Sequence, residues 1–230
     1  MADISAPDGT APLISVRGTV TLEVDPEIAE LSVQVAARDK DRERTLRRLS
    51  DRQRAVRAVL ESFGDAVDKL ETAGLRVRPE LHGKRAGEKV AGYLGTVRTT
   101  VTVSDFTVLG DLVMRVGDED MTSVDGPWWS LRQDSPVYTR ARQEAVRDAL
   151  TRAREYAAAV GCRLTGLREL ADTGLSTGVR QDGMAYGAMT LAAERGAPGG
   201  GPPPLDLDPA TQHVSAQVEA RFTATPPALD

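Results

Sequence analysis

The stretch that decides the fold runs from Ser135 to Gly161, SPVYTRARQEAVRDALTRAREYAAAVG. It predicts a long helix, because Ser135 can cap the first free amides, Pro136 suits the first turn and Gly161 can adopt the left-handed conformation that ends a helix. Small side chains recur on one face of this helix, at Ala141, Ala145, Ala149, Ala153 and Ala157. They let the helix backbone come close to its neighbour, so we expect this face to cover a sheet.

Alternation of apolar and polar residues, the period of a half-buried strand, appears on both sides of this helix. It is clearest from Ile14 to Val24 and from Leu31 to Ala37, with the turn Asp25-Pro26 between them. Because these strands are so close in the chain, we expect them to form an antiparallel hairpin. The sequence predicts further strands near residues 75–81, 93–103, 123–131, 164–170 and 214–222, of which 93–103 is the longest and 214–222 alternates as clearly as the first two.

Two more segments have helical periodicity, residues 39–63 and residues 105–116. The predicted order is therefore β-β-α-β-β-α-β-α-β-β. Alternation in most strands indicates a sheet with one packed and one solvated face. We therefore predict an α+β fold, with a largely antiparallel sheet and helices packed on one of its faces.

The domain organisation follows from composition along the chain. Residues 1–11 are polar and predict a flexible arm, and residues 225–230 predict a tail. Residues 12–224 are predicted to form a single domain. Within it, residues 172–210 read as a loop-rich insertion, because the run GAPGGGPPP is incompatible with regular structure.

Composition narrows the class of protein. The chain has 230 residues, 40% of them hydrophobic, which is ordinary for a soluble globular protein. Its net charge of −5 argues against a general nucleic-acid binder. Cys162 is the only cysteine, so we expect no intrachain disulfide and interpret this residue as a small buried hydrophobe. With no signal-peptide pattern at the start and no membrane-spanning run, we expect a cytoplasmic protein.

The sequence offers no group of residues that predicts catalysis. It lacks the glycine-rich phosphate-binding loops, and its only histidines, His82 and His213, have no ligand-like partners nearby. Acids gather in DEDMTSVDG, from Asp118 to Gly126, but their spacing does not fit a calcium-binding loop. These acids are either a solvated turn or, if two of them are buried, the carboxylates of an unrecognised hydrolase or ligand-binding enzyme. We predict no catalytic residue, cofactor or metal ligand.

Basic residues concentrate in the first predicted helix. Nine bases against four acids between Arg38 and Arg57 give a local excess of five positive charges. One interpretation is a solvated face with internal ion pairs. The alternative is an interface for an acidic partner or RNA, with Arg47 and Arg48 as candidates. The lack of interleaved aromatic residues argues against the nucleic-acid version.

Trp128 and Trp129 are adjacent in one predicted strand, so they must point to opposite faces. Leu131 shares its parity with Trp129, so we place Trp129 in the core and direct Trp128 outward. Two explanations for Trp128 remain open. Either a loop of the same chain, such as residues 172–210, covers it, or it lies in a subunit or partner interface, where tryptophan is a common anchor.

Four segments of the chain, in order, resemble those of one known protein family. ISVRGTVTLEVDPEIAELSVQV resembles its opening strands, and AGYLGTVRTTVTVSDFTVLGDLV is similar to its Gly-Tyr strand and the helix start after it. ARQEAVRDALTRAREYAAAVG and DLDPATQHVSAQVEARF resemble its Ala-rich helix and closing strand, so the resemblance, which is to the SIMPL domain family, covers about residues 13–224. Departures are Val20 in place of a glycine, Glu27 in place of an aspartate, and GPWWSL in place of Gly-Ile-x-Phe-x-Leu.

The resemblance implies an α+β fold without an established enzymatic activity. Relatives include periplasmic immunogenic proteins and oxidative-stress-defence proteins of bacterial envelopes, some of which form ring- or channel-like homo-oligomers. Those relatives carry signal peptides. Our leading hypothesis is a non-enzymatic protein that acts by self-assembly or by binding a protein partner, with a link to stress response. The hydrolase and the Arg-rich-helix hypotheses are the alternatives.

Overall fold

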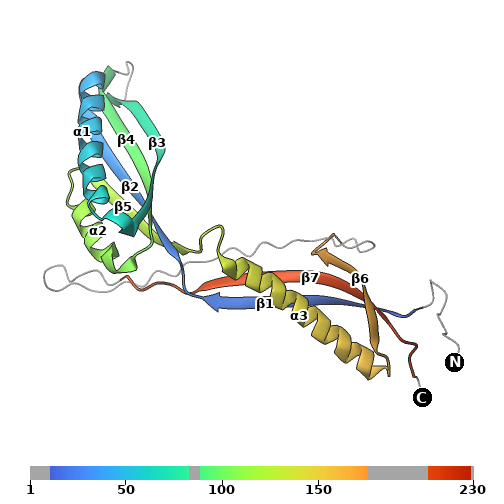
Figure 1. Cartoon of the computed structure of the whole chain (residues 1–230). Coiled ribbons are helices and arrows are strands. Elements are labelled where there is room, and N and C mark those ends of the chain that lie inside the picture. Colours follow the sequence, from blue (N-terminus) through green and yellow to red (C-terminus); the bar gives the residue numbers. More distant parts are fainter. Residues whose placement is uncertain (1–10, 83–88, 176–206, 229–230) are drawn as a thin grey trace, which may run out of the picture. The chain divides into compact units, whose positions relative to one another are not determined.

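The computed structural model describes residues 11–82, 89–175 and 207–228 (Figure 1). Its regular elements are β1 (Leu13–Val24), β2 (Ile28–Asp39), α1 (Arg42–Glu61), β3 (Val67–His82), β4 (Lys89–Val103), α2 (Leu109–Gly117), β5 (Thr122–Ser130), α3 (Pro136–Ala159), β6 (Leu164–Asp172) and β7 (Gln212–Ala224). Short 3₁₀ helices precede β3 and α2, at Gly64–Ala66 and Phe106–Val108. The predicted order of strands and helices and the α+β class are confirmed.

The chain divides into two compact units, each with its own sheet. Unit 1 takes in residues 1–24, 133–196 and 213–230, and its sheet has the strand order β1-β7-β6. Unit 2 takes in residues 25–132 and 197–212, and its sheet has the order β3-β4-β2-β5. That residues 12–224 act as one domain stays a prediction.

Unit 1 is built on the long helix, as the sequence predicts. The Ser135 hydroxyl accepts a hydrogen bond from the Val137 amide, Pro136 opens α3, and Gly161 has a φ of 67° just beyond its end. The five alanines of one face are all buried. Ala149 and Ala153 pack with Val16 of β1 and with residues of β7. The prediction that this face covers a sheet is confirmed.

Gly18 of β1 explains how close the helix comes. A Cβ atom at this position would lie 1.9 Å from the Ala145 carbonyl oxygen and 2.6 Å from the Ala149 amide nitrogen. Because only hydrogen fits there, the backbones of β1 and α3 touch directly.

The predicted hairpin between the first two strands is wrong. β1 pairs with β7, while β2 pairs with β4 and β5. A short connection allows two strands to pair but does not require it. Here Asp25-Pro26 connects two strands that belong to different sheets. Side chains of β1 and β7 also contact each other. Arg17 forms an ion pair with Glu219 at 2.9 Å, and the hydroxyl groups of Thr21 and Ser215 share a hydrogen bond of 2.9 Å.

Unit 2 is an antiparallel sheet with α1 and α2 on one of its faces, as Figure 1 shows. Alternate residues of the central strands β2 and β4 form its core with apolar residues of the two helices. Fully buried members include Leu31, Val33, Val101, Leu60 and Leu112.

β3 is longer than predicted, because it begins at Val67 rather than after Gly74. Its pairing with β4 shifts register at three places, between Val67 and Lys69, between Thr72 and Gly74, and between Glu80 and Leu81. Each such irregularity breaks the two-residue period, so alternation is lost in the first half of the strand.

Cys162 is buried against Ala157 and Ala224, as predicted for a small hydrophobe. Most of the predicted arm, the run GAPGGGPPP, most of the 172–210 insertion and the end of the tail lie outside the described residues.

Candidate interaction surface

The candidate surface is the face of the four-stranded sheet in unit 2 that α1 and α2 do not cover, called here the open face. Val33 and Val97 are buried beneath the helices, so the side chains next to them in β2 and β4 point to the other side. The pairing registers extend this assignment to β3 and β5. The open face consists of Lys69, Glu71, Arg76, Arg78 and Glu80 from β3, Leu94, Thr96, Arg98, Thr100 and Thr102 from β4, Glu30, Ser32, Gln34, Ala36 and Arg38 from β2, and Ser123, Asp125 and Trp128 from β5.

Charge is distributed unevenly over the open face. In the register, Arg98 lies opposite Gln34 on one side and Gly74 on the other, and Arg76 lies opposite Thr96. Arginines therefore gather toward one end of the face. At the other end, β5 places Trp128 opposite Glu30.

A hollow of about 380 Å³ opens at the arginine end. We call it the arginine hollow and define it by Gln34, Gly74, Arg76, Thr96 and Arg98. Two guanidinium groups, an amide and a hydroxyl line it, and none of the described residues in its lining carries a carboxylate. It is therefore a site of positive charge and hydrogen-bond donors.

Two acids of the open face lie near the hollow, and both already have partners. Glu71, opposite Thr100, pairs with Lys69 at 2.8 Å. Glu80 accepts a hydrogen bond from Arg38 Nη2 at 2.6 Å. This hydrogen bond and the charges of Arg38 and Arg78 hold the pKa of Glu80 below its usual range. By contrast, within the described chain no carboxylate lies within ion-pair distance of Arg76 or Arg98, and Arg98 donates only to Gln34 Oε1, at 3.3 Å.

The structure places the predicted candidates Arg47 and Arg48 on α1, which covers the opposite face of the sheet. Arg47 pairs with Glu43 at 2.6 Å, one helical turn away, and Arg48 pairs with Asp39 at 3.3 Å. An amide hydrogen bond from Asp41, and then the charges of Arg44 and Arg48, lower the pKa of Asp39. The helix thus carries the internal ion pairs of the first interpretation, while partner binding by Arg47 and Arg48 stays a prediction.

The two tryptophans point as predicted. Trp129 packs against the core of unit 2, with its ring edge-on to Phe106 at a centroid distance of 4.9 Å. Trp128 is 52% exposed on the open face. The loop proposed to cover it belongs largely to residues 176–206, which lie outside the described residues.

The acidic turn between α2 and β5 lies at the surface. Asp118, Asp120 and Asp125 are exposed, and Asp120 pairs with Arg52 at 3.7 Å. Two buried carboxylates, which the hydrolase hypothesis requires, are not found at this turn. Among the residues described, no group of three or more histidine, cysteine or acidic side chains could hold a metal ion.

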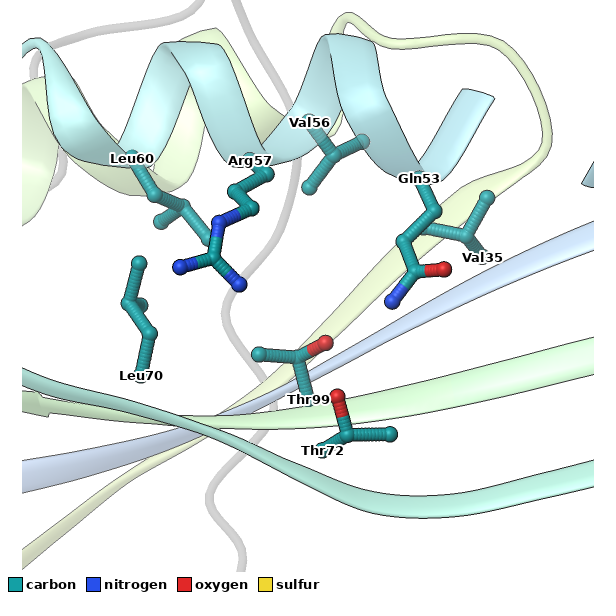
Figure 2. Close-up of a pocket in the computed structure, with 8 residues that line it drawn as sticks. All are labelled: Val35, Gln53, Val56, Arg57, Leu60, Leu70, Thr72 and Thr99. Carbon is teal, nitrogen blue, oxygen red and sulfur yellow. The ribbon is translucent and has the colours of Figure 1, made fainter. Parts of the chain in front are cut away.

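A small cavity lies between α1 and the sheet, with Gln53 and Arg57 of the helix pointing toward Thr72 and Thr99 of the strands (Figure 2). Its volume of about 20 Å³ admits one water molecule and no larger ligand. Arg57 is also held by Glu61 at 2.7 Å. We therefore interpret this cavity as a small packing defect between α1 and the sheet, with no role in ligand binding.

Unit 1 has an apolar groove of about 420 Å³ between α3, β6 and β7. Leu167 and Leu170 of β6 line it and are 57% and 48% exposed. Among the described residues that line it, only Arg154 is charged. No helix in the described part of the chain is both long and apolar enough to cross a membrane.

Sequence reasoning did not single out Arg76 and Arg98. The available signal was their outward parity, opposite to Leu75 and Val97 in the same strands. What the sequence could not supply is the register that brings β3 and β4 together and places the two arginines around Gly74.

Comparisons with known proteins point to one family. The SIMPL family, described as "Protein of unknown function (DUF541)", matches residues 14–222. The chain is also similar to proteins named "Uncharacterized protein YggE" from Escherichia coli strain K12, Escherichia coli O157:H7 and Shigella flexneri, each 25% identical over 154 residues. These matches cover 66% of this chain and span 61% of the length of the relatives. Because the family match runs through the strands and helices of both units, the chain belongs to the SIMPL family.

Proposed function

We propose that the protein acts without catalysis, by binding a protein through the open face of unit 2. The partner is either a second copy of the chain or a different protein. The observation that carries this proposal is Trp128, a large aromatic side chain that stands half exposed on the sheet face that α1 and α2 leave uncovered. Tryptophan is enriched among the residues that contribute most to protein interfaces.

The rest of the open face supports this proposal. Its centre carries hydroxyl and amide groups such as Ser32, Gln34, Thr96 and Thr100, which can exchange hydrogen bonds with water for hydrogen bonds with a partner. Trp128 thus offers an apolar anchor at one end of the open face, polar side chains occupy the centre, and charged side chains lie at the arginine end.

The absence of catalysis is part of the proposal. The hydrolase hypothesis depends on buried acids among residues 118–125, whereas Asp118, Asp120 and Asp125 are exposed and Glu119 is only half-buried. A survey of ester, phosphoester and peptide substrates is expected to give no turnover. Turnover that disappears when Asp118 or Asp120 becomes asparagine would favour the hydrolase.

A link to stress response, suggested by the resemblance to stress-defence proteins, is also proposed. Cells that lack the protein should survive peroxide less well than cells that carry it, and Trp128→Ala should fail to restore survival. Equal survival of the cells with and without the protein would remove this part of the proposal.

Light scattering combined with sedimentation tests the interface directly. If the protein self-associates, Trp128→Ala should shift it to the monomer, while Tyr156→Ala, which removes an exposed aromatic residue of unit 1, should not. If the wild-type protein is a strict monomer, self-assembly is excluded and only a different partner remains. An assembly that Trp128→Ala leaves intact would contradict the proposed interface.

A further inference from the structure

The arginine hollow combines positive charge with an arrangement of hydrogen-bond donors. The guanidinium groups of Arg76 and Arg98, the Thr96 hydroxyl and the Gln34 amide all border it. The Gln34 oxygen already accepts from Arg98 Nη2 at 3.3 Å, so its amide nitrogen stays available as a donor. Planar guanidinium groups suit carboxylates in particular, because two N–H donors match two oxygens.

Gly74 keeps the hollow open. It follows the register shift in β3, and a Cβ atom placed on it would meet no atom within 4 Å. Any larger residue here would extend a side chain into the space between the two arginines. The lack of a side chain at this position, opposite Arg98, therefore creates the room that a ligand group would occupy.

The hollow is continuous with the rest of the open face. Glu30, which lies opposite Trp128, is four residues from Gln34 in β2, a distance of about 13 Å along the strand. Across the sheet, β4 and β5 lie on either side of β2 and are therefore about 10 Å apart. An extended segment of about five residues can therefore reach from the hollow to Trp128. Near Trp128 the face carries Glu30 and Asp125, so its charge favours an acidic group only at the arginine end.

We propose that the arginine hollow binds carboxylate side chains of an acidic, extended polypeptide segment that continues along the open face toward Trp128. This inference rests on the proposed function and specifies the chemistry of its partner. A single small anion gains little from solvated arginines at a surface, so a free ion would be held weakly. A polypeptide adds linked contacts, and its second contact forms at the high effective concentration set by the first.

The test uses the full chain and a synthetic peptide of about ten residues that alternates glutamate and threonine, which places its carboxylates on one side when extended. The peptide carries a neutral dye, and binding is followed by fluorescence anisotropy. A matching peptide with lysine in place of glutamate serves as the charge control. Titrations at about 20 mM and about 150 mM salt measure the electrostatic contribution.

Three variants separate binding in the hollow from attraction by general positive charge. Arg76→Gln with Arg98→Gln should weaken binding of the glutamate peptide about tenfold or more. Arg47→Gln with Arg48→Gln removes the same charge from α1 on the other side of the sheet and should leave binding unchanged. Gly74→Leu keeps both arginines but fills the hollow, and it should weaken binding as well. Circular dichroism checks that each variant is folded.

Several results would overturn the inference. The first is that the wild-type chain does not bind the glutamate peptide, and the second is that it binds the lysine peptide equally well. A loss of affinity in the Arg47/Arg48 variant equal to that in the Arg76/Arg98 variant would indicate diffuse electrostatic attraction. If the peptide does not bind but inorganic phosphate does, and phosphate binding requires Arg76 and Arg98, the hollow is a site for free anions instead. If Trp128→Ala disrupts association but the peptide does not bind, the proposed function stands and this inference falls. If the peptide binds at the hollow while association is independent of Trp128, this inference stands and the role of Trp128 as the anchor of the proposed interface falls instead.

Discussion

Replacing Gly18 with alanine tests the contact on which unit 1 is built. The new Cβ atom would lie 1.9 Å from the Ala145 carbonyl oxygen and 2.8 Å from the Ala149 Cβ atom, whereas non-bonded carbon contacts are about 3.5 Å or longer. Since one obstacle is backbone, rotation of a side chain cannot relieve the clash. The helix α3 or the strand β1 must move.

The expected magnitude follows from two opposing effects. Overpacking of a tight contact costs about 1–3 kcal/mol, and backbone obstacles place this site at the upper end. Alanine in a strand recovers about 0.5–1 kcal/mol of the conformational entropy that glycine loses on folding. We expect a net loss of about 2 kcal/mol, which corresponds to a melting temperature about 4–8 °C lower for a chain of this size.

Thermal unfolding followed by circular dichroism measures the effect. Gly74→Ala is the matched control, because its Cβ meets nothing within 4 Å, and it should melt at or slightly above the wild-type temperature. Both tryptophans belong to unit 2, so their fluorescence shows whether the loss is confined to unit 1. A Gly18→Ala variant as stable as the wild type would refute the close packing of α3 on β1.

Three further outcomes are expected from unfolding measurements. Ala149→Leu should cost about 1–3 kcal/mol in urea unfolding, and an unchanged midpoint would show that the alanine face of α3 is not packed. Trp129→Ala should cost about 2–4 kcal/mol, whereas equal losses at Trp129 and at the adjacent tryptophan would contradict their assigned faces. A hydrogen bond from the Ser104 hydroxyl, and then the ion pair with Arg132 at 2.6 Å, lower the pKa of Asp68. At pH values above the unfolded-state pKa of about 3.9, Asp68→Asn should therefore lower the free energy of unfolding by about 1 kcal/mol relative to the wild type. This difference in stability should vanish as the pH falls through the lower folded-state pKa, and a difference that persists there would contradict the assignment.

Local patterns were sufficient to predict the elements. The caps Ser135 and Gly161 marked α3, and the four-residue spacing of its alanines identified the packed face. Parity with Leu131, together with the resemblance to the SIMPL family, separated Trp128 from Trp129. In each case the physical cause acts over a few neighbouring residues, so the sequence contains it directly.

Pairing of strands could not be predicted, because it depends on residues far apart in the chain. The turn at Asp25-Pro26 suggested a hairpin, yet the partner of β1 is β7, at the other end of the sequence. The arginine hollow was missed for the same reason. Arg76 and Arg98 become neighbours only through the register of β3 and β4, and the shift before Gly74 is invisible to a two-residue period.

Photo-crosslinking in living cells tests the central claim, that the open face is a protein interface, most directly. A photoreactive amino acid in place of Trp128 should give a covalent adduct with a protein, identified by mass spectrometry as a second copy or a different partner. The same amino acid in place of Tyr156, an exposed aromatic residue of unit 1, is the control and should give no such adduct. If position 128 yields no adduct above this control, the open face does not bind protein and the account is contradicted.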